Sequence, residues 1–160
     1  MDCLKIGPDG RFFKEPEEDV TDFYSFNEPV YAPADGQITE VVDSFPSDHM
    51  GDRDTEHPGG NHVILDIGND KYFYVAHLRK GKIPVEVGQT VNKGTILGYI
   101  GMSGNTYFPH LHIHVQNKPT AEQDGRITFP FRFKNIHRKR LIFWQEVSSA
   151  DLIRNDRFQE

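Results

Sequence analysis

Three histidines alternate with other residues in the run Pro109-His110-Leu111-His112-Ile113-His114. Residues two apart in a β-strand point to the same face of a sheet, so this alternation places the three imidazoles on one side. Neutral imidazole nitrogens are ligands of Zn²⁺, at about 2.0 to 2.1 Å. The exposed polar face of a half-buried strand would show the same alternation. Three histidines after a rigid proline favour a chemical role over that alternative.

His77 is a second candidate, because it follows a run of aromatic residues, Lys71-Tyr72-Phe73-Tyr74-Val75-Ala76. A histidine at the end of a strand can reach a site at the edge of a sheet. For a single histidine, packing in the core or exposure on the surface is the competing interpretation. Taken alone, His77 favours that competing interpretation.

A carboxylate must complete any zinc site here, since two histidines seldom suffice. Asp2, Asp22 and Asp66 all lie on or near expected strands, and residue type alone does not choose among them. The HExxH motif is absent, which excludes the helix-borne zinc site common in peptidases.

The elements that position these residues are β-strands, since short runs of Val, Ile, Tyr and Phe alternate with Gly and Pro. The pattern predicts a mainly β fold, a small antiparallel sheet or barrel-sandwich with little helix. The clearest strands are residues 37–44, 62–67, 71–77 and 111–116, with a hairpin joining 62–67 to 71–77. Less regular segments are expected as a strand at 1–6, sharp corners across 85–101, strands at 129–133 and 141–145, and a helical turn at 149–154 capped by Ser149.

Residues 46–60 form the longest stretch without apolar periodicity, and hold four acidic residues, two histidines and three glycines. Such loops are often functional, but a plain surface loop is equally compatible with this composition.

Bulk composition limits the class of protein. The chain has 160 residues, which fits a single domain over 1–160, and a net charge of −6. An acidic chain is a poor partner for nucleic acid, and the basic run 137–140 is interpreted as a solvated turn or strand edge. Cys3 is the only cysteine, so no internal disulfide can form. No apolar run approaches the roughly 20 residues of a membrane span.

Several motifs occur together in the order found in one known family. They are Pro29-Val30-Tyr31-Ala32-Pro33-Ala34-Asp35-Gly36, Gly60-Asn61-His62-Val63-Ile64, Tyr74-Val75-Ala76-His77-Leu78, Val87-Gly88-Gln89-Thr90-Val91-Asn92-Lys93-Gly94, Leu97-Gly98, Ser103-Gly104-Asn105 and Pro109-His110-Leu111-His112. The chain thus resembles the lysostaphin/LytM-type zinc metallopeptidases over about residues 29–115. The resemblance implies the duplicated-hybrid-motif fold, an antiparallel β domain with a groove. Residues 116–160 would be a C-terminal extension packed on it.

The resemblance also implies a site and an activity. In this family zinc is held by the His and Asp of an HxxxD motif and by the second His of HxH, which corresponds here to His112. His77 and His110 correspond to the residues that orient the attacking water and stabilise the oxyanion. The implied cofactor is Zn²⁺, and the implied reaction is hydrolysis of peptide bonds in bacterial cell-wall peptidoglycan.

The HxxxD motif is where this sequence departs from the family, because no histidine precedes Pro29. Asp22 lies near the usual distance before Pro29, with Glu18 in the position of the missing His. We prefer Asp2 as the metal ligand, because it heads a strand-like run as in a longer-loop subset of the family. On this interpretation Met1 is an internal methionine and the chain is truncated at its N-terminus.

The same departure governs the expected location. The chain opens without a signal peptide, so we expect an extracytoplasmic protein if the chain is truncated, and a cytoplasmic one otherwise.

His114 is not expected to bind the same ion as His112, since a strand places it roughly 6 to 7 Å beyond His112. Phe108 stands where the family usually has a small residue, and its ring would narrow the groove.

Three functions from different classes follow. The first is a zinc-dependent endopeptidase acting on peptide or peptidoglycan, and the second is a degenerate, non-catalytic module that binds peptidoglycan or regulates another cell-wall hydrolase. The third, a lipoyl-like carrier using Lys93, leaves the histidines without a role. The missing HxxxD histidine favours the second, whereas the presence of His77, His110 and His112 favours the first. The oligomeric state is left open.

Overall fold

The structure is a computed structural model that describes residues 1–51, 53–133, 137–140, 143–146 and 158–159. It divides into two compact units, Met1–Phe129 and Pro130–Glu160. Within the second unit, β10 (His137–Arg140) lies between β11 (Phe143–Glu146) and β12 (Phe158–Gln159) in an antiparallel sheet. The basic run is therefore a central strand there, and the expected turn or sheet edge is wrong. The expectation that residues 116–160 pack on the family-like part stays a prediction.

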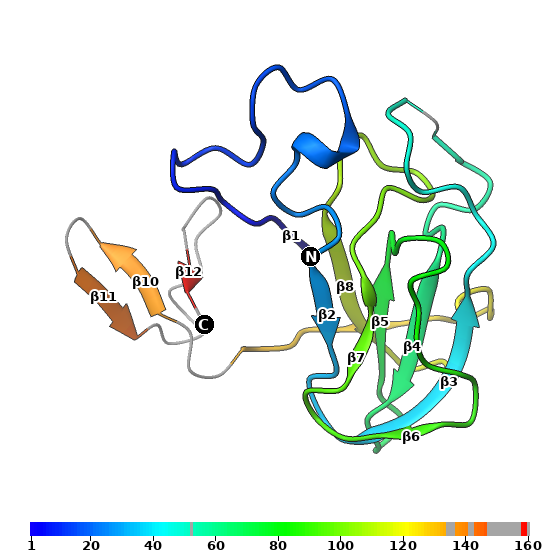
Figure 1. The fold of residues 1–160 in the computed structure, drawn as a ribbon. Coiled ribbons are helices and arrows are strands. Elements are labelled where there is room, and N and C mark those ends of the chain that lie inside the picture. Colours follow the sequence, from blue (N-terminus) through cyan, green and yellow to red (C-terminus); the bar gives the residue numbers. More distant parts are fainter. Residues whose placement is uncertain (52, 134–136, 141–142, 147–157, 160) are drawn as a thin grey trace. The chain divides into compact units, whose positions relative to one another are not determined.

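The first unit is built on an antiparallel seven-stranded sheet (Figure 1), in the order β1-β8-β5-β4-β3-β6, with β9 also pairing with β8. Its strands are β1 (Asp2–Cys3), β3 (Gly36–Val42), β4 (His62–Asp66), β5 (Tyr72–Ala76), β6 (Thr90–Val91), β8 (Leu111–Gln116) and β9 (Thr128–Phe129). A second, two-stranded sheet pairs β2 (Pro29–Tyr31) with β7 (Ile96–Tyr99). The 3-10 turn η1 (Val20–Asp22) is the one helical element among the described residues. None of the described helical residues forms a helix long and apolar enough to cross a membrane.

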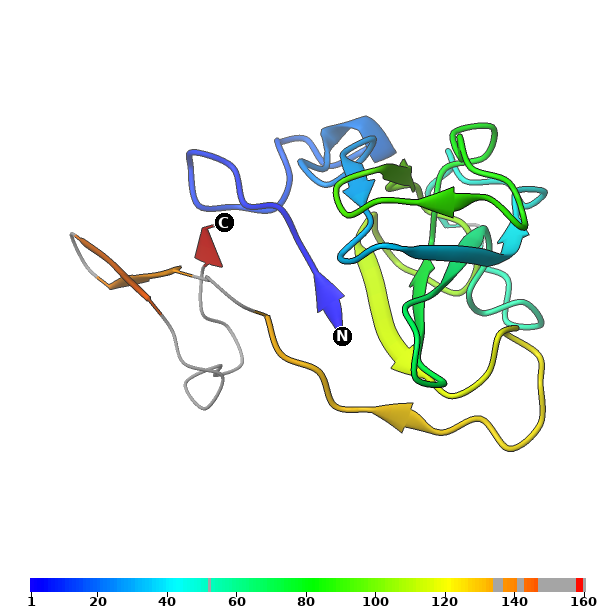
Figure 2. The ribbon, with the colours of Figure 1, turned by 90° about the horizontal axis from the view of Figure 1, so that it is seen from below.

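The pleat of the large sheet separates an apolar face from a face that mixes polar and apolar residues. Val75 of β5 is paired with Val63 of β4 and with Ile113 of β8, so these three side chains share one face. All three are at most 3 % exposed, and the apolar residues of this face form the core. Figure 2 shows β2 and β7 lying across the larger sheet, with Leu97 of β7 fully buried. The opposite face carries the residues between these positions, which are His112 and His114 together with the buried residues Ile64, Tyr74 and Ala76.

An irregularity in β3 changes the face to which one carboxylate points. Ile38 is paired with Leu65, whereas Glu40 is paired with Ile64, so the register shifts between Ile38 and Glu40. This bulge turns Glu40 to the same face of the sheet as His114, because in a bulge two residues of one strand lie opposite one residue of its partner. There, Glu40 Oε2 lies 3.1 Å from His62 Nε2 and accepts a hydrogen bond from the backbone N–H of Ala121.

The mainly β, antiparallel fold expected from the sequence is confirmed, including the hairpin of β4 and β5. Residues 46–60 contain no strand or helix among their described members. The expected strand at 129–133 is wrong, because β9 ends at Phe129, and Phe131 and Phe133 contact each other edge-on outside any strand. Of the strand expected at 141–145, β11 contains residues 143–145, and residues 141–142 lie outside the described residues. The helical turn at 149–154 also lies outside the described residues.

Candidate metal centre

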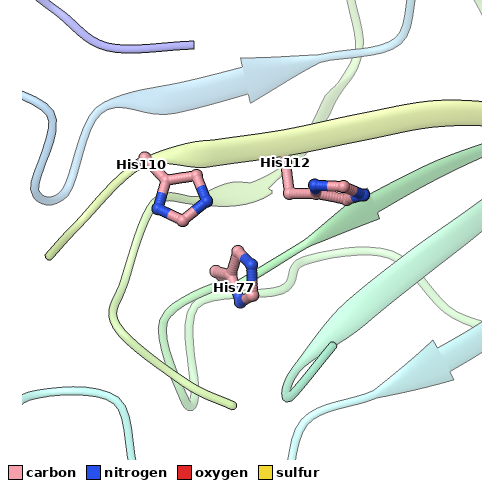
Figure 3. Close-up of side chains that lie close together, drawn as sticks. All are labelled: His77, His110 and His112. Carbon is pink, nitrogen blue, oxygen red and sulfur yellow. The ribbon is translucent and has the colours of Figure 1, made fainter. Parts of the chain in front are cut away.

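The end of β5 and the start of β8 bring three histidines together (Figure 3). Antiparallel pairing of Ala76 with His112 places His77, which follows β5, beside the beginning of β8. One ring nitrogen from each of His77, His110 and His112 lies within 4.8 Å of the others. The ring centre of His77 lies 4.6 Å from that of His110 and 5.8 Å from that of His112. The sequence-predicted histidines therefore form one cluster.

His77 is a buried, neutral imidazole held by the backbone. Its side chain is 6 % exposed, and its Nδ1 lies 2.8 Å from the carbonyl oxygen of Ser103. A carbonyl can only accept, so Nδ1 carries the proton and Nε2 keeps its lone pair. Burial, with the positive charge of neighbouring His110 adding to it, lowers the pKa of His77 to about 4.

His77 also has a left-handed backbone conformation, with φ of 62°. This conformation is uncommon for residues other than glycine and needs support from its surroundings. The His77 N–H donates to the Gly59 carbonyl at 3.1 Å, and the His77 carbonyl accepts from the Gly101 N–H at 2.9 Å. Two loops thus hold the turn that aims the imidazole at the cluster.

His110 presents its Nε2 in the same way. Its Nδ1 lies 3.0 Å from the Phe108 carbonyl and 3.1 Å from the Thr106 hydroxyl oxygen. The Thr106 hydroxyl donates to the same Phe108 carbonyl, so its oxygen can accept from His110. Nδ1 of His110 is therefore the donor, and Nε2 is left as a basic nitrogen 3.6 Å from Oδ1 of Asp2.

Asp2 reaches this cluster through strand pairing, because β1 pairs with β8 and places Asp2 directly opposite His112. Figure 2 shows β1 (dark blue) alongside β8 (yellow-green). Oδ1 of Asp2 lies 2.7 Å from Nδ1 of His112. Burial raises the pKa of Asp2, but the hydrogen bond to His112 and the charges of His110 and His112 outweigh it, and the pKa lies below its ordinary value. Burial, together with the positive charges of the N-terminus and His110, lowers the pKa of His112 below its ordinary value although Asp2 raises it.

These groups fit a divalent cation of the zinc class. A carboxylate and a neutral imidazole are the protonation states that metal ligation requires. Nδ1 of His112 and Oδ1 of Asp2 lie next to each other on paired strands, and Oδ1 of Asp2 also lies 3.6 Å from Nε2 of His110. Nitrogen and carboxylate oxygen are the donor types that zinc accepts together.

The alternative carboxylates have other partners. Asp22 lies in η1, where its Oδ2 accepts from the backbone N–H groups of Glu18 and Asp19, each at 3.0 Å. Asp22 therefore caps the 3-10 turn. Asp66 lies at the far end of β4 and its Oδ1 accepts from the N–H of Gly68 at 2.8 Å in the hairpin turn. Asp2 is the one of the three carboxylates that contacts the histidines.

Phe108 packs beside the cluster in a group of aromatic rings. Its ring centre lies 5.5 Å from Phe12, 6.3 Å from Phe23 and 5.7 Å from His110. The bulky residue that departs from the family pattern is thus accommodated by Phe12 and Phe23, which come from the segment between β1 and β2. His114 lies outside the three-histidine group and faces His112 and Gln116.

Sequence reasoning missed the buried polar residues that hold this site. Asn61 is fully buried, and its backbone N–H donates to Ser103 Oγ. Its side-chain Oδ1 accepts from the Phe45 N–H, and its Nδ2 donates to the carbonyls of Phe45 and Leu78. Asn61 and Ser103 stood in the motifs as sequence matches without a role. Their position beside the glycines at 60 and 104 could have indicated a close contact between two loops, since a Cβ on Gly60 would lie 2.4 Å from the Ser103 carbonyl carbon.

The loop of residues 46–60 forms the wall of an open pocket of about 620 Å³. Phe45, Asp54, Glu56 and Gly104 are among its lining residues. Arg53 donates to Asn105 Oδ1 at 2.6 and 3.0 Å and lies over the ring of Tyr107 at 3.9 Å. None of the three clustered histidines is among the lining residues of this pocket.

Comparison with known proteins places this arrangement in a family. The sequence pattern of Peptidase family M23 matches residues 19–125, which is more than half of the chain. The chain belongs to peptidase family M23. The family resemblance expected from the motifs is thereby confirmed, and its match extends beyond residues 29–115 on both sides.

Individual relatives of this M23 chain are larger proteins. It is 28 % identical over 109 residues to the glycyl-glycine endopeptidase ALE-1 of Staphylococcus capitis, covering 68 % of the chain and 27 % of that protein. It is 32 % identical over 102 residues to the peptidoglycan DD-endopeptidase ShyA of Vibrio cholerae, covering 62 % of the chain and 20 % of that protein. The structure of the antimicrobial peptidase lysostaphin from Staphylococcus simulans matches at 30 % identity with a TM-score of 0.44, covering 59 % of this chain and 34 % of that one. The M23 chain thus spans about a quarter or less of the length of ALE-1 and ShyA.

Proposed function

We propose that the chain is a zinc-dependent endopeptidase that hydrolyses peptide bonds in bacterial peptidoglycan. The observation that carries this proposal is the cluster of His77, His110 and His112 at one end of the large sheet, with Asp2 in contact with His112 and His110. Its chemical class is supported by membership of a peptidase family and by two relatives named as endopeptidases, one of them for peptidoglycan.

Asp2 and His112 would hold the ion, through Oδ1 and Nδ1 respectively. Bound Zn²⁺ supplies Lewis acidity and lowers the pKa of water to about 7, which makes a nucleophile available at neutral pH. His112 and Asp2 come from paired positions on β8 and β1, so the backbone hydrogen bonds of two strands position the ligand atoms.

His77 and His110 would take part in the proton transfers of the reaction. Each has its Nδ1 proton bound to a backbone carbonyl, which leaves Nε2 of each ring as a base facing the cluster. One of these nitrogens would accept a proton from the attacking water and then donate that proton to the leaving amine, and the other would accept a hydrogen bond from the water and so orient it. The lowered pKa of His77 keeps it neutral, and thus able to accept a proton, throughout the neutral range.

A non-catalytic M23 module that binds peptidoglycan or regulates another hydrolase is the second candidate. It is favoured by one observation, the absence of histidine from residues 1–48, which leaves the HxxxD motif without its His. Fewer protein ligands weaken zinc binding. The burial and orientation of His77 and His110 favour the enzyme, because a binding module has no need of two basic nitrogens aimed at one point.

Metal content and hydrolysis measured together test the proposal. The purified chain, dialysed against Zn²⁺ and then against metal-free buffer, is expected to retain zinc and to release new amino groups from purified peptidoglycan. His112→Ala should lose both properties. A wild-type chain that sediments with peptidoglycan but releases no amino groups would support the binding module and contradict the enzyme.

A further inference from the structure

The row of polar side chains on β8 continues beyond the metal centre. His112, His114 and Gln116 lie on the same face of the sheet, two residues apart. Nε2 of His112 lies 3.2 Å from Nδ1 of His114, and Nε2 of His114 lies 2.8 Å from Oε1 of Gln116. The three side chains form a hydrogen-bonded chain that runs from the proposed metal ligand into the protein.

The side-chain amide of Gln116 determines which atoms donate and which accept along this row of hydrogen bonds. It is fully buried, and its amide nitrogen donates to the carbonyls of Lys118 at 2.8 Å and Thr120 at 3.1 Å. Two carbonyl partners fix the amide orientation, because a flipped amide would face both carbonyls with its oxygen. Oε1 of Gln116 therefore points to His114 as an acceptor, and Nε2 of His114 must donate.

The proton on Nε2 of His114 also determines which nitrogen of His112 must carry a proton. An imidazole that is neutral and has its proton on Nε2 has only a lone pair on Nδ1. Nδ1 of His114 therefore accepts, and Nε2 of His112 donates. This leaves Nδ1 of His112 opposite Oδ1 of Asp2, 2.7 Å away. Two acceptor atoms at that distance need one cation between them, either a proton or a metal ion.

The ring of His114 is held in this orientation by packing. It stacks on Tyr74 of the neighbouring strand, with ring centres 4.5 Å apart and planes at 26°. Tyr74 is 5 % exposed and lies directly opposite His114 in the β5–β8 pairing. His114 therefore has one face covered by an aromatic ring and both nitrogens occupied, which restricts its rotation.

We propose that His114 and Gln116 are positioning residues that keep the proton of His112 on Nε2 and so reserve Nδ1 for the ion shared with Asp2. The proposal rests on the proposed zinc site. Without the pair, the arrangement favoured for a neutral imidazole beside a carboxylate is Nδ1–H donating to Asp2. That arrangement occupies both ligand atoms with one proton, so a metal ion would have to displace it. Groups that orient a ligating histidine typically change metal affinity by roughly 10- to 100-fold.

Nitrogen NMR of the metal-free full chain tests the proton's position without any zinc. At pH 7.5, long-range ¹H–¹⁵N spectra should show a proton on Nε2 of His112. His114→Phe keeps an aromatic ring for Tyr74 but removes the acceptor, and should move the His112 proton to Nδ1. His114→Asn returns an amide oxygen near the position of Nδ1 and should restore the wild-type signal. A wild-type His112 with a bare Nε2, or an unchanged signal in His114→Phe, would overturn the proposal.

Zinc affinity, measured by competition with a chromophoric chelator, is the second readout. We expect His114→Phe to weaken binding by roughly 10- to 100-fold, and His114→Asn to recover most of the loss. Equal affinities for wild type and His114→Phe would also overturn the proposal. If the wild type binds no zinc although Nε2 of His112 carries the proton, the proposed function fails and the inference about the positioning pair stands.

Discussion

At the scale of single residues, the histidines differ in which nitrogen the protein leaves free. His77 and His110 use backbone carbonyls to hold the proton on Nδ1, so Nε2 faces the cluster. His112 presents Nδ1 to Asp2 instead. Residues that share one chemical type are thus given different tasks by their hydrogen-bond partners, because each neutral imidazole has one donor and one acceptor.

The burial of His77 should make the metal-free protein sensitive to acid. The pKa of His77 is about 4 in the folded chain, against an ordinary value of 6.5 that applies when it is unfolded. Its contribution is fully present above pH 6.5 and is lost as pH falls to about 4, because only the unfolded state takes up the proton in between. The difference corresponds to about 3 kcal/mol of unfolding free energy.

Urea unfolding at pH 7 and pH 4 measures this effect. Between pH 7 and pH 4, we expect the unfolding free energy of His77→Gln to fall by about 3 kcal/mol less than that of the wild type. The other histidines remain in both proteins, so the difference between the two losses measures the His77 side chain together with its electrostatic interaction with His110. The same loss of stability in both proteins would contradict the buried, neutral state of His77.

His110 is expected to be needed for hydrolysis and dispensable for folding. His110→Ala should reduce the rate of amino-group release by roughly 10²- to 10⁴-fold, the usual contribution of general acid–base catalysis. Because Asp2 and His112 remain, the zinc content should change little. His49→Ala, which removes an exposed histidine of the long loop, is the matched control and should keep full activity. An active His110→Ala protein would show that this ring has no part in the reaction.

At the scale of elements, the loops around the site depend on Asn61. Its side chain joins Phe45, in the loop after β3, to Leu78, the residue after His77. Asn61→Ala removes the side-chain partner of the Phe45 N–H and of the Phe45 carbonyl, and one of the two donors to the Leu78 carbonyl, so we expect a loss of about 2 to 4 kcal/mol in unfolding free energy. Chemical denaturation measures it, with the exposed Asn92→Ala as control. A stability equal to that of the control would mean that water replaces the amide.

The elements also show how far the sequence could predict the site. Alternation of residue types predicted β4, β5 and β8. It also predicted that His110, His112 and His114 share one face, because strand pleating is a local property. The bulge in β3 that directs Glu40 to His62 was not predictable, since it depends on how one strand is paired with another. The role of Gln116 was equally hidden, because its partners, Lys118 and Thr120, accept through backbone carbonyls that no residue type reveals.

At the scale of the whole molecule, the candidate metal centre is contained in the first compact unit. Every strand of the large sheet, the β2–β7 pair and the histidine cluster lie within residues 1–129. Family resemblance predicted this part because its motifs lie in it, whereas residues 130–160 lie beyond the M23 match. The sequence pattern there led to the mistaken strand at 129–133, since alternating phenylalanines do not by themselves provide a pairing partner.

We expect a chain that ends after Phe129 to fold and to keep the zinc affinity of the full chain within about threefold, since each proposed ligand and its supporting residues are retained. Phe129 is kept because β9 pairs with β8, the strand that carries His112. Circular dichroism and zinc competition measure the two properties. A truncated chain that is unfolded would show that residues 130–160 are required for the stability of the first unit.

The pairing of β1 with β8 gives the protein a chemical reporter of its own. Cys3, the only thiol, follows Asp2 on a strand of two residues and is half-buried opposite Leu111. An ion held between Asp2 and His112 binds only while that strand is docked, so by thermodynamic linkage it must favour docking by as much as docking favours its binding. Alkylation of Cys3 should therefore slow down when zinc is added and return to its original rate with a chelator. In Asp2→Asn the two rates should become nearly equal, so a single thiol would report when the centre is assembled.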